Sequence, residues 1–277
     1  MGLRGKIEEV VRGILREIDL VKKNGMKDVL HLVDELRRGT VIALGDADVL
    51  TPSIADTVRA RIAELIHQFE ERVLVKMNEY QRRSFVRGIQ LVDKSISAGN
   101  VRFAVPYLSQ QTLEYLRNYN ASLIKGISDL ARERISQEIT LGVLGQKPAT
   151  DIIKAIGKNL DSPSVFGTIS KRAETIYRTE IDRAHNLASQ NRIKQIAPQL
   201  GDLMKEWRHG YVGIPRANHL VLHGKRVEAT EKFHLVGIHG ALYEVDGPQD
   251  AILPPEESIN CRCVAIPVLR RFDHIRK

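Results

Sequence analysis

Apolar residues recur every three or four positions over most of the first two hundred residues, which is the period of an α-helix. The first stripe predicts a helix that ends at Asn24-Gly25, a pair typical of helix C-termini. A shorter helix carrying Val29, Val33 and Leu36 is expected next, followed by a brief strand within residues 40–50.

The second stripe predicts a much longer helix. Thr51-Pro52-Ser53 combines a capping hydroxyl with a proline, as helix starts do. The stripe then continues for about forty residues, far beyond the roughly 11–12 residues of an average helix. A long helix with one apolar face needs a partner helix, and a third stripe from about Ser109 to Ile135 supplies one. This pattern predicts a helical hairpin or coiled-coil stalk.

The character of the chain changes towards its C-terminus. A small helix is expected within residues 149–160 and another long one over 168–196. After Pro198, short β-like runs alternate with turn residues at 225–229, 232–237 and 241–245. The chain is therefore expected to be α+β: a long-helix region over 1–160 that binds a partner, followed by a small domain with short antiparallel strands over 161–277.

Composition narrows the class of protein without naming it. With 43% hydrophobic and 27% charged residues, the chain is globular and not disordered. Its formal net charge is +8, and residues 101–200 hold fourteen basic against nine acidic residues. This surplus suits an acidic partner and leaves nonspecific contact with DNA phosphates open. No stretch of eighteen apolar residues occurs, so no membrane span is expected.

One carboxylate lies where a carboxylate is costly. On a helical wheel, Glu180 falls in the middle of an apolar face, with Arg183 on its flank. A buried carboxylate needs a cation or hydrogen-bond donors, so a partner is expected elsewhere in the chain. Arg216 and Arg262 are the candidates. A structural ion pair is favoured over catalysis.

Two histidines and two cysteines form the second constellation. In a helix, His219 and His223 lie four residues apart on one side, and Pro215 and Gly224 bracket such a helix. In an extended segment, Cys261 and Cys263 face the same way. Two imidazoles and two thiolates complete a tetrahedral zinc site. The alternatives are two polar side chains on a half-exposed turn and two small core residues, because Cys-x-Cys is tighter than the usual spacing.

The order of these motifs resembles the phage Mu F-like head morphogenesis family. The likeness covers roughly residues 140–268 and rests on a helix containing Arg178-Thr179-Glu180 and on a C-terminal Asn260-Cys261-Arg262-Cys263. The stretch 210–216 lacks the acidic residue that members often carry there. The loop Pro254–Glu257 also differs from the family pattern.

The resemblance implies a fold, a set of partners and a place in the cell. It implies a non-enzymatic minor head protein, associated with the portal and other head proteins, in the virion head and in the host cytoplasm during assembly. It also implies that one clustered core network forms from Glu180, Arg183, Asn186, Arg216, His219, Asn260, Cys261, Arg262 and Cys263.

An enzyme is the alternative hypothesis. In that case His219, His223, Cys261 and Cys263 form the site of a metal-dependent hydrolase or nuclease, such as a phage-borne toxin. A metal site closed by four protein ligands favours a structural role, whereas three protein ligands with an open position in a cleft favour catalysis.

Overall fold

A computed structural model describes residues 3–45, 50–101, 111–145, 147–160, 163–210 and 215–272. Two 3₁₀ turns lie at Ala197–Gln199 and Arg270–Phe272. The helices are α1 (Leu3–Gly45), α2 (Pro52–Ala98), α3 (Gln111–Val143), α4 (Ala149–Ile156), α5 (Val165–Ile196), α6 (Ala217–Leu220) and α7 (Pro255–Ser258), and the strands are β1 (Leu203–Arg208), β2 (Arg226–Glu228), β3 (Phe233–Val236), β4 (Leu242–Val245) and β5 (Val264–Leu269).

Long helices followed by short antiparallel strands confirm the expected fold class. Contacts divide the chain into two units that interleave along the sequence. Unit 1 comprises residues 1–23, 80–114 and 178–277, and unit 2 comprises 24–79 and 115–177. The boundary expected between residues 160 and 161 stays a prediction.

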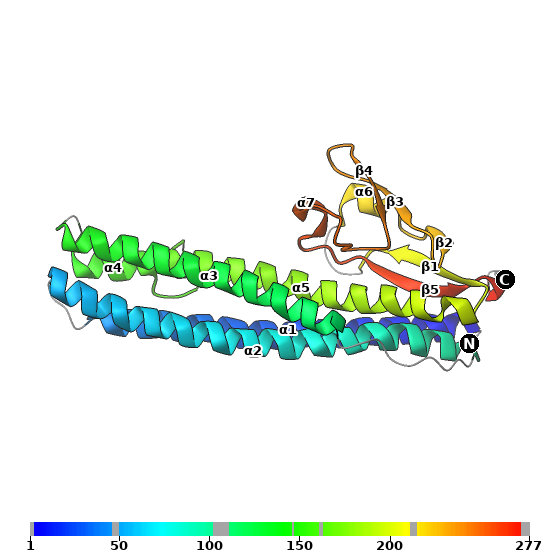
Figure 1. Ribbon diagram of the computed structural model, residues 1–277, viewed down its shortest axis with the longest axis horizontal. Coiled ribbons are helices and arrows are strands. Elements are labelled where there is room, and N and C mark those ends of the chain that lie inside the picture. The colour runs from blue at the N-terminus through cyan, green and yellow to red at the C-terminus, as the bar shows by residue number, and fades with distance from the viewer. Residues whose placement is uncertain are drawn as a thin grey trace. The chain divides into compact units, whose positions relative to one another are not determined.

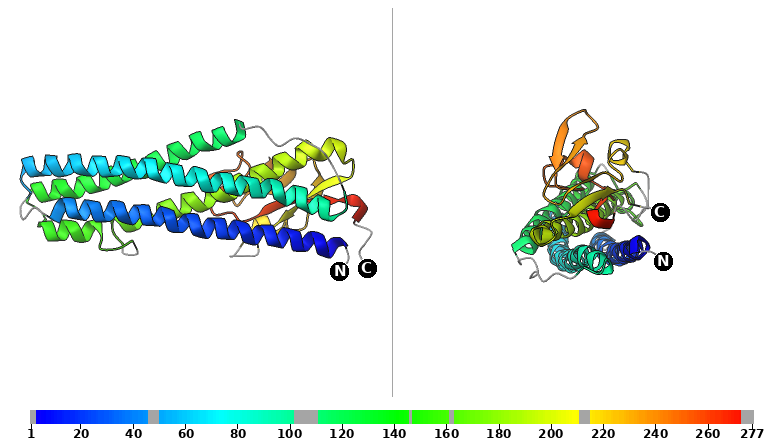
Figure 2. Two further views of the ribbon diagram at one scale, coloured as in Figure 1. Left: turned by 90° about the horizontal axis from the view of Figure 1, so that it is seen from below. Right: turned by 90° about the vertical axis from the view of Figure 1, so that its right-hand side faces the viewer.

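Unit 2 is a bundle of antiparallel helices. Arg72 of α2 forms an ion pair with Glu35 of α1, and the two helices run side by side (Figure 2, left). Asn120 of α3 donates to Asn78 of α2 at 3.1 Å. Farther along the same pair of helices, a second hydrogen bond joins Arg59 to Thr140 at 3.0 Å. These contacts confirm the hairpin predicted for α2 and α3.

The first helix corrects two expectations. The predicted end at Asn24-Gly25 is wrong, because α1 continues unbroken to Gly45. Met26, Val29 and Val33 are buried beyond the glycine, and tertiary burial outweighs a helical glycine that costs about 1 kcal/mol. The strand expected within 40–50 is likewise wrong for 40–45, which are helical; residues 46–49 lie outside the described residues.

Other boundaries agree with the sequence. The hydroxyl of Thr51 accepts the backbone N–H of Ile54 at the start of α2, as a capping residue does. Residues 102–110, between α2 and α3, lie outside the described residues. Within the described residues, no helix is long and apolar enough to cross a membrane.

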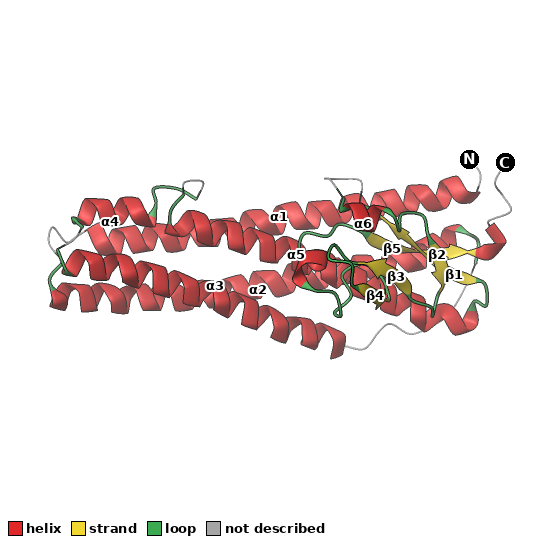
Figure 3. Ribbon diagram, turned by 90° about the horizontal axis from the view of Figure 1, so that it is seen from above, coloured by secondary structure: helices red, strands yellow, loops and turns green. Residues whose placement is uncertain are grey.

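Unit 1 contains both sheets. The strands all follow α5 in the chain (Figures 1 and 3). One antiparallel sheet has the order β2-β1-β5, with Trp207 opposite Ala265, and the other pairs β3 with β4. The three runs expected at 225–229, 232–237 and 241–245 are confirmed as β2, β3 and β4, whereas β1 and β5 were not expected.

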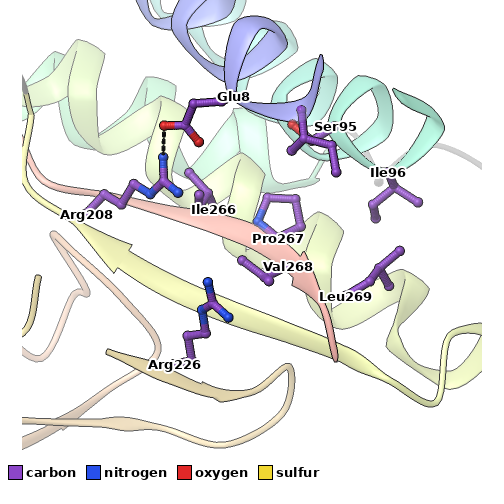
Figure 4. Close-up of a pocket in the computed structure, with 10 residues that line it drawn as sticks. Glu8, Ser95, Ile96, Arg208, Arg226, Ile266, Pro267, Val268 and Leu269 are labelled. Atoms are coloured by element: carbon purple, nitrogen blue, oxygen red, sulfur yellow. Dashed lines mark hydrogen bonds and ion pairs between the residues drawn. The ribbon is translucent and has the colours of Figure 1, made fainter. Parts of the chain in front are cut away.

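Strand β5 lies against the helices of unit 1. Its Val264 and Ile266 share an apolar cluster with Val11, Ile14 and Ile18 of α1 and Leu91 of α2. A cavity of about 50 Å³ adjoins this region, and Figure 4 shows the ion pair between Glu8 of α1 and Arg208 of β1 beside it. The helical N-terminus and the sheet therefore share one core within unit 1.

We expect Gly88→Ala to lower the melting temperature. A Cβ at Gly88 of α2 would overlap the carbonyl oxygen of His185 in α5 and lie 2.8 Å from the Cβ of Ala188. Overpacking of this kind costs about 1–3 kcal/mol. Gly13→Ala is the matched control, because nothing lies within 4 Å of a Cβ there and helical alanine gains about 0.5–1 kcal/mol over glycine. Equal melting temperatures for the two variants would contradict this packing.

Candidate functional site

Side chains of α5 hold the extended segment that precedes β5. Asn186 donates through Nδ2 to the carbonyl oxygen of Cys263 at 3.0 Å. One turn later, the hydroxyl of Ser189 donates to the carbonyl oxygen of Ala265 at 2.9 Å. Both helix residues are almost fully buried. Buried backbone carbonyls need a donor, and here α5 provides it.

Gln249 adds a second layer to the same contact. Its Oε1 accepts from Asn186 at 2.9 Å, and its Nε2 donates to the carbonyl oxygens of Cys261 and Thr179. The hydroxyl of Thr179 accepts the backbone N–H of Asn260. Gln249 and Asn260 have φ of 59° and 56°, so two non-glycine residues adopt left-handed backbone where the chain turns towards α5.

The tripeptide Cys261-Arg262-Cys263 is extended, as expected. Both thiols are buried and reduced and belong to a core that includes Trp207. Arg262 points the other way and lines a cavity of about 490 Å³ with Lys22 and other residues of α1 and α5. The alternation of an extended chain therefore separates the sulfur atoms from the charge.

His219 stands between a carboxylate and the two thiols. Its Nε2 lies 2.8 Å from Oε2 of Glu257, and its Nδ1 lies 3.5 Å and 3.7 Å from the sulfur atoms of Cys261 and Cys263. The edge of the Trp207 ring packs on the imidazole, with the centroids 5.6 Å apart. His219 is 1% exposed, so its imidazole contacts these protein groups and almost no solvent.

Glu257 is held as a carboxylate despite its burial. It accepts two hydrogen bonds from the Nδ2 of Asn218 and a third, at 2.7 Å, from the backbone N–H of Ile238. Burial alone raises the pKa of this carboxyl, but the hydrogen bonds from Asn218, Ile238 and His219 lower the pKa below its usual range. An ionised carboxylate only accepts hydrogen bonds, so Nε2 of His219 carries the proton.

His223 does not join this cluster, which corrects the predicted ligand pair. Helix α6 ends at Leu220, so the two histidines do not share a helix face. Gly224 has φ of 79° and donates to the carbonyl oxygen of Trp207, which turns the chain back towards β1. His223 is exposed, and its ring lies against that of His209 with the centroids 4.4 Å apart.

Glu180 is buried as predicted, but its partner is not where the sequence placed it. Its carboxylate is 3% exposed and pairs with Arg183 of the same helix at 3.4 Å. Arg216 instead donates to the carbonyl oxygen of Ile259, and Arg262 lines the cavity. Burial raises the pKa of Glu180 to about 7, although Arg183 opposes the rise. Glu180, Arg216 and Arg262 therefore make separate contacts and do not form the single network that the resemblance implied.

Three residues of the site were missed by sequence reasoning. Gln249 directly follows the turn at 246–248, and Thr179 was noted only as part of a motif. Glu257 lies in α7, within the stretch Pro254–Glu257 whose departure from the family pattern was the available signal. That departure supplies the carboxylate that orients His219.

Comparison with known proteins places this site in a family. Residues 132–266, which include the α5 face, His219 and both cysteines, match the family model described as phage Mu protein F like protein. This part of the chain belongs to the phage Mu F-like family. The match agrees with the resemblance drawn from the motifs.

One curated relative of this chain is the uncharacterized protein YqbB of Bacillus subtilis (strain 168). The two are 27% identical over 169 residues, which cover 60% of this chain and 52% of the relative. The chain thus spans about half the length of the relative. No solved structure matches the chain.

We expect Glu180→Gln to change how stability depends on pH. The folded-state pKa lies near 7 and the ordinary value is 4.5, so the folded chain binds the extra proton between these values. Wild-type stability is therefore lost as the pH rises from about 4.5 through about 7. Glutamine mimics the protonated side chain. The variant should match the wild type near pH 4.5 and exceed it above pH 7 by about 3 kcal/mol.

Thermal unfolding at a series of pH values measures this difference. Glu9→Gln is the control, because it removes an exposed carboxylate from α1 and should leave the pH dependence as it is in the wild type. Glu180→Gln stability that follows the wild type across the whole range would show that the buried carboxylate is not destabilised by burial.

Proposed function

We propose that the chain is a minor head protein of a tailed phage or prophage, which associates with the portal and acts in head morphogenesis, with a further role in DNA packaging or ejection. The observation that carries this proposal is the family match over residues 132–266. On this proposal the chain lies in the virion head, and in the host cytoplasm while heads assemble.

A structural role is supported over an enzymatic one by the state of the candidate ligands. His219, Cys261 and Cys263 are all buried, and neither of the two cavities described in unit 1 is lined by them. His223, which the hydrolase hypothesis requires, contacts His209 instead. A catalytic metal needs a position open to substrate, so this arrangement favours a core that supports the fold.

The helices of unit 2 are suited to binding a partner protein. Tyr115 and Tyr119 lie one turn apart on α3 and are 78% and 43% exposed. Tyrosine is enriched at the centres of protein interfaces, where its ring is buried and its hydroxyl still finds a partner. We assign this helix to the contact with the portal or another head protein.

We expect the chain to co-purify with the portal protein encoded in the same phage or prophage genome when the two are expressed together. Replacing both Tyr115 and Tyr119 with serine should weaken the complex by about 30-fold or more, since such aromatic anchors contribute about 1–2 kcal/mol each. Arg134→Ser, on the exposed side of the same helix, is the control. Failure of the wild-type chain to associate with the portal, together with nuclease activity, would overturn the proposed function.

Contact with packaged DNA is limited by pairing within the protein. Six basic residues lie on α5, but the structure pairs Arg183 with Glu180, Arg192 with Asp93 and Lys194 with Asp246. Paired cations neutralise fewer phosphates. The surplus charge of residues 101–200 therefore supports weak and nonspecific contact only. The three other basic residues of this helix, all exposed, are Lys171, Arg172 and Arg178.

We expect DNA binding that is independent of sequence and lost as salt rises. Fluorescence anisotropy with two duplexes of unrelated sequence, measured from 50 to 200 mM salt, tests this expectation. Lys171→Ser with Arg172→Ser should lower the affinity at low salt, whereas Arg192→Lys, within the buried pair with Asp93, should not. Tight binding that distinguishes the two duplexes would contradict nonspecific contact.

A further inference from the structure

The arrangement of His219, Cys261 and Cys263 has the dimensions of a metal site. Tetrahedral zinc binds thiolate sulfur at about 2.3 Å and imidazole nitrogen at about 2.0–2.1 Å, which separates a sulfur ligand from a nitrogen ligand by about 3.6 Å. The two sulfur atoms lie 3.5 Å and 3.7 Å from Nδ1 of His219. All three ligand atoms lie within 4.8 Å of one another.

The imidazole presents the correct nitrogen to the sulfur atoms. The N–H at Nε2 donates a hydrogen bond to Oε2 of Glu257, 2.8 Å away, which leaves the lone pair of Nδ1 facing Cys261 and Cys263. A carboxylate that binds the far nitrogen of a histidine is the usual support of a metal ligand, because it fixes the tautomer and the ring orientation. Asn218 and the backbone N–H of Ile238 hold that carboxylate in turn.

The backbone of residues 261–263 also holds both thiol side chains on one side of the segment. The carbonyl oxygens of Cys261 and Cys263 are bound by Gln249 and Asn186, so the segment is fixed in the extended form that aims both sulfur atoms at His219. Two thiolates, a neutral imidazole and a divalent cation have no net charge. Such a group is stable in a core where an isolated charge is costly.

We propose that His219, Cys261 and Cys263 bind one Zn²⁺ ion, with Glu257 as the residue that positions the imidazole. The site lies in the core around Trp207 and Phe233, and its role is structural. The ion joins α6 to the segment held by α5, which is more than forty residues away in sequence. The described residues provide three ligands, and a small ligand such as water completes the tetrahedron. The proposal goes beyond head morphogenesis and needs no portal partner.

Elemental analysis of the full chain, purified under reducing conditions without a chelator, tests the proposal. We expect about one zinc per chain in the wild type. His219→Ala and Cys261→Ser should lose it. His223→Ala is the matched control, because that imidazole lies outside the cluster, and it should retain the metal. Zinc that is absent from the wild type, or lost equally in His223→Ala and His219→Ala, would overturn the proposal.

A second measurement needs no variant. Adding Co²⁺ to the folded, metal-free wild-type chain should produce thiolate-to-metal charge-transfer absorption and the intense d–d bands of a tetrahedral site, and Zn²⁺ should displace them. Glu257→Gln should still bind Co²⁺, with an affinity lower by about 10–100-fold. A folded wild-type chain that shows no such absorption would exclude the site even if every variant failed to fold.

Discussion

The hydrogen bonds that α5 gives to the segment before β5 are the contact on which the rest of unit 1 depends. Cys261 and Cys263 are buried but precede the first paired residue of β5, so no neighbouring strand satisfies their carbonyl oxygens. Unpaired, each would cost about 1–3 kcal/mol. Asn186 and Gln249 bind two of these oxygens, and the chain can therefore remain extended inside the core. That extension sends the thiols to one side and Arg262 to the other.

The same helix separates two kinds of charge. On one side, Asp182 of α5 pairs with Lys22 of α1 at 2.9 Å beside the larger cavity. In the apolar row, Glu180 has only Arg183 at 3.4 Å, and one of its oxygens lacks a hydrogen-bond partner among the described residues. Glu180 is therefore kept at a cost in stability. The Glu180–Arg183 pair is next to Thr179, whose carbonyl oxygen accepts from Gln249. The destabilising carboxylate therefore lies beside the hydrogen bonds that hold the segment before β5.

Periodicity predicted most of the helices and the three short strands, because each of these elements has one apolar face or a clear turn at its end. It missed β1, where Lys205 and Glu206 are buried despite their charge, and β5, where Pro267 interrupts the run. Proline is tolerated there because β5 is an edge strand of its sheet. At Asn24-Gly25 the sequence predicted a helix end that does not exist. The local preference of these residues for a helix end was outweighed by the burial of apolar residues before and after them in α1.

The sequence could predict several residues of the candidate site but not the contacts between them. Residue types and spacing singled out Glu180, His219 and the two cysteines, and all four are buried. Spacing could not show that α6 ends at Leu220, so it assigned His223 to a site that it does not reach.

Glu257 lies thirty-eight residues from His219 in sequence, and only the tertiary fold brings the two together. Glu257 accepts hydrogen bonds from the backbone N–H of Ile238, which follows β3, and from His219 of α6, while α5 fixes the cysteines. Hydrogen bonds and the packing of Trp207 on the imidazole thus place a histidine nitrogen and two sulfur atoms at metal-binding distance. The helical and the β parts of unit 1 have to be correctly folded together before this geometry exists.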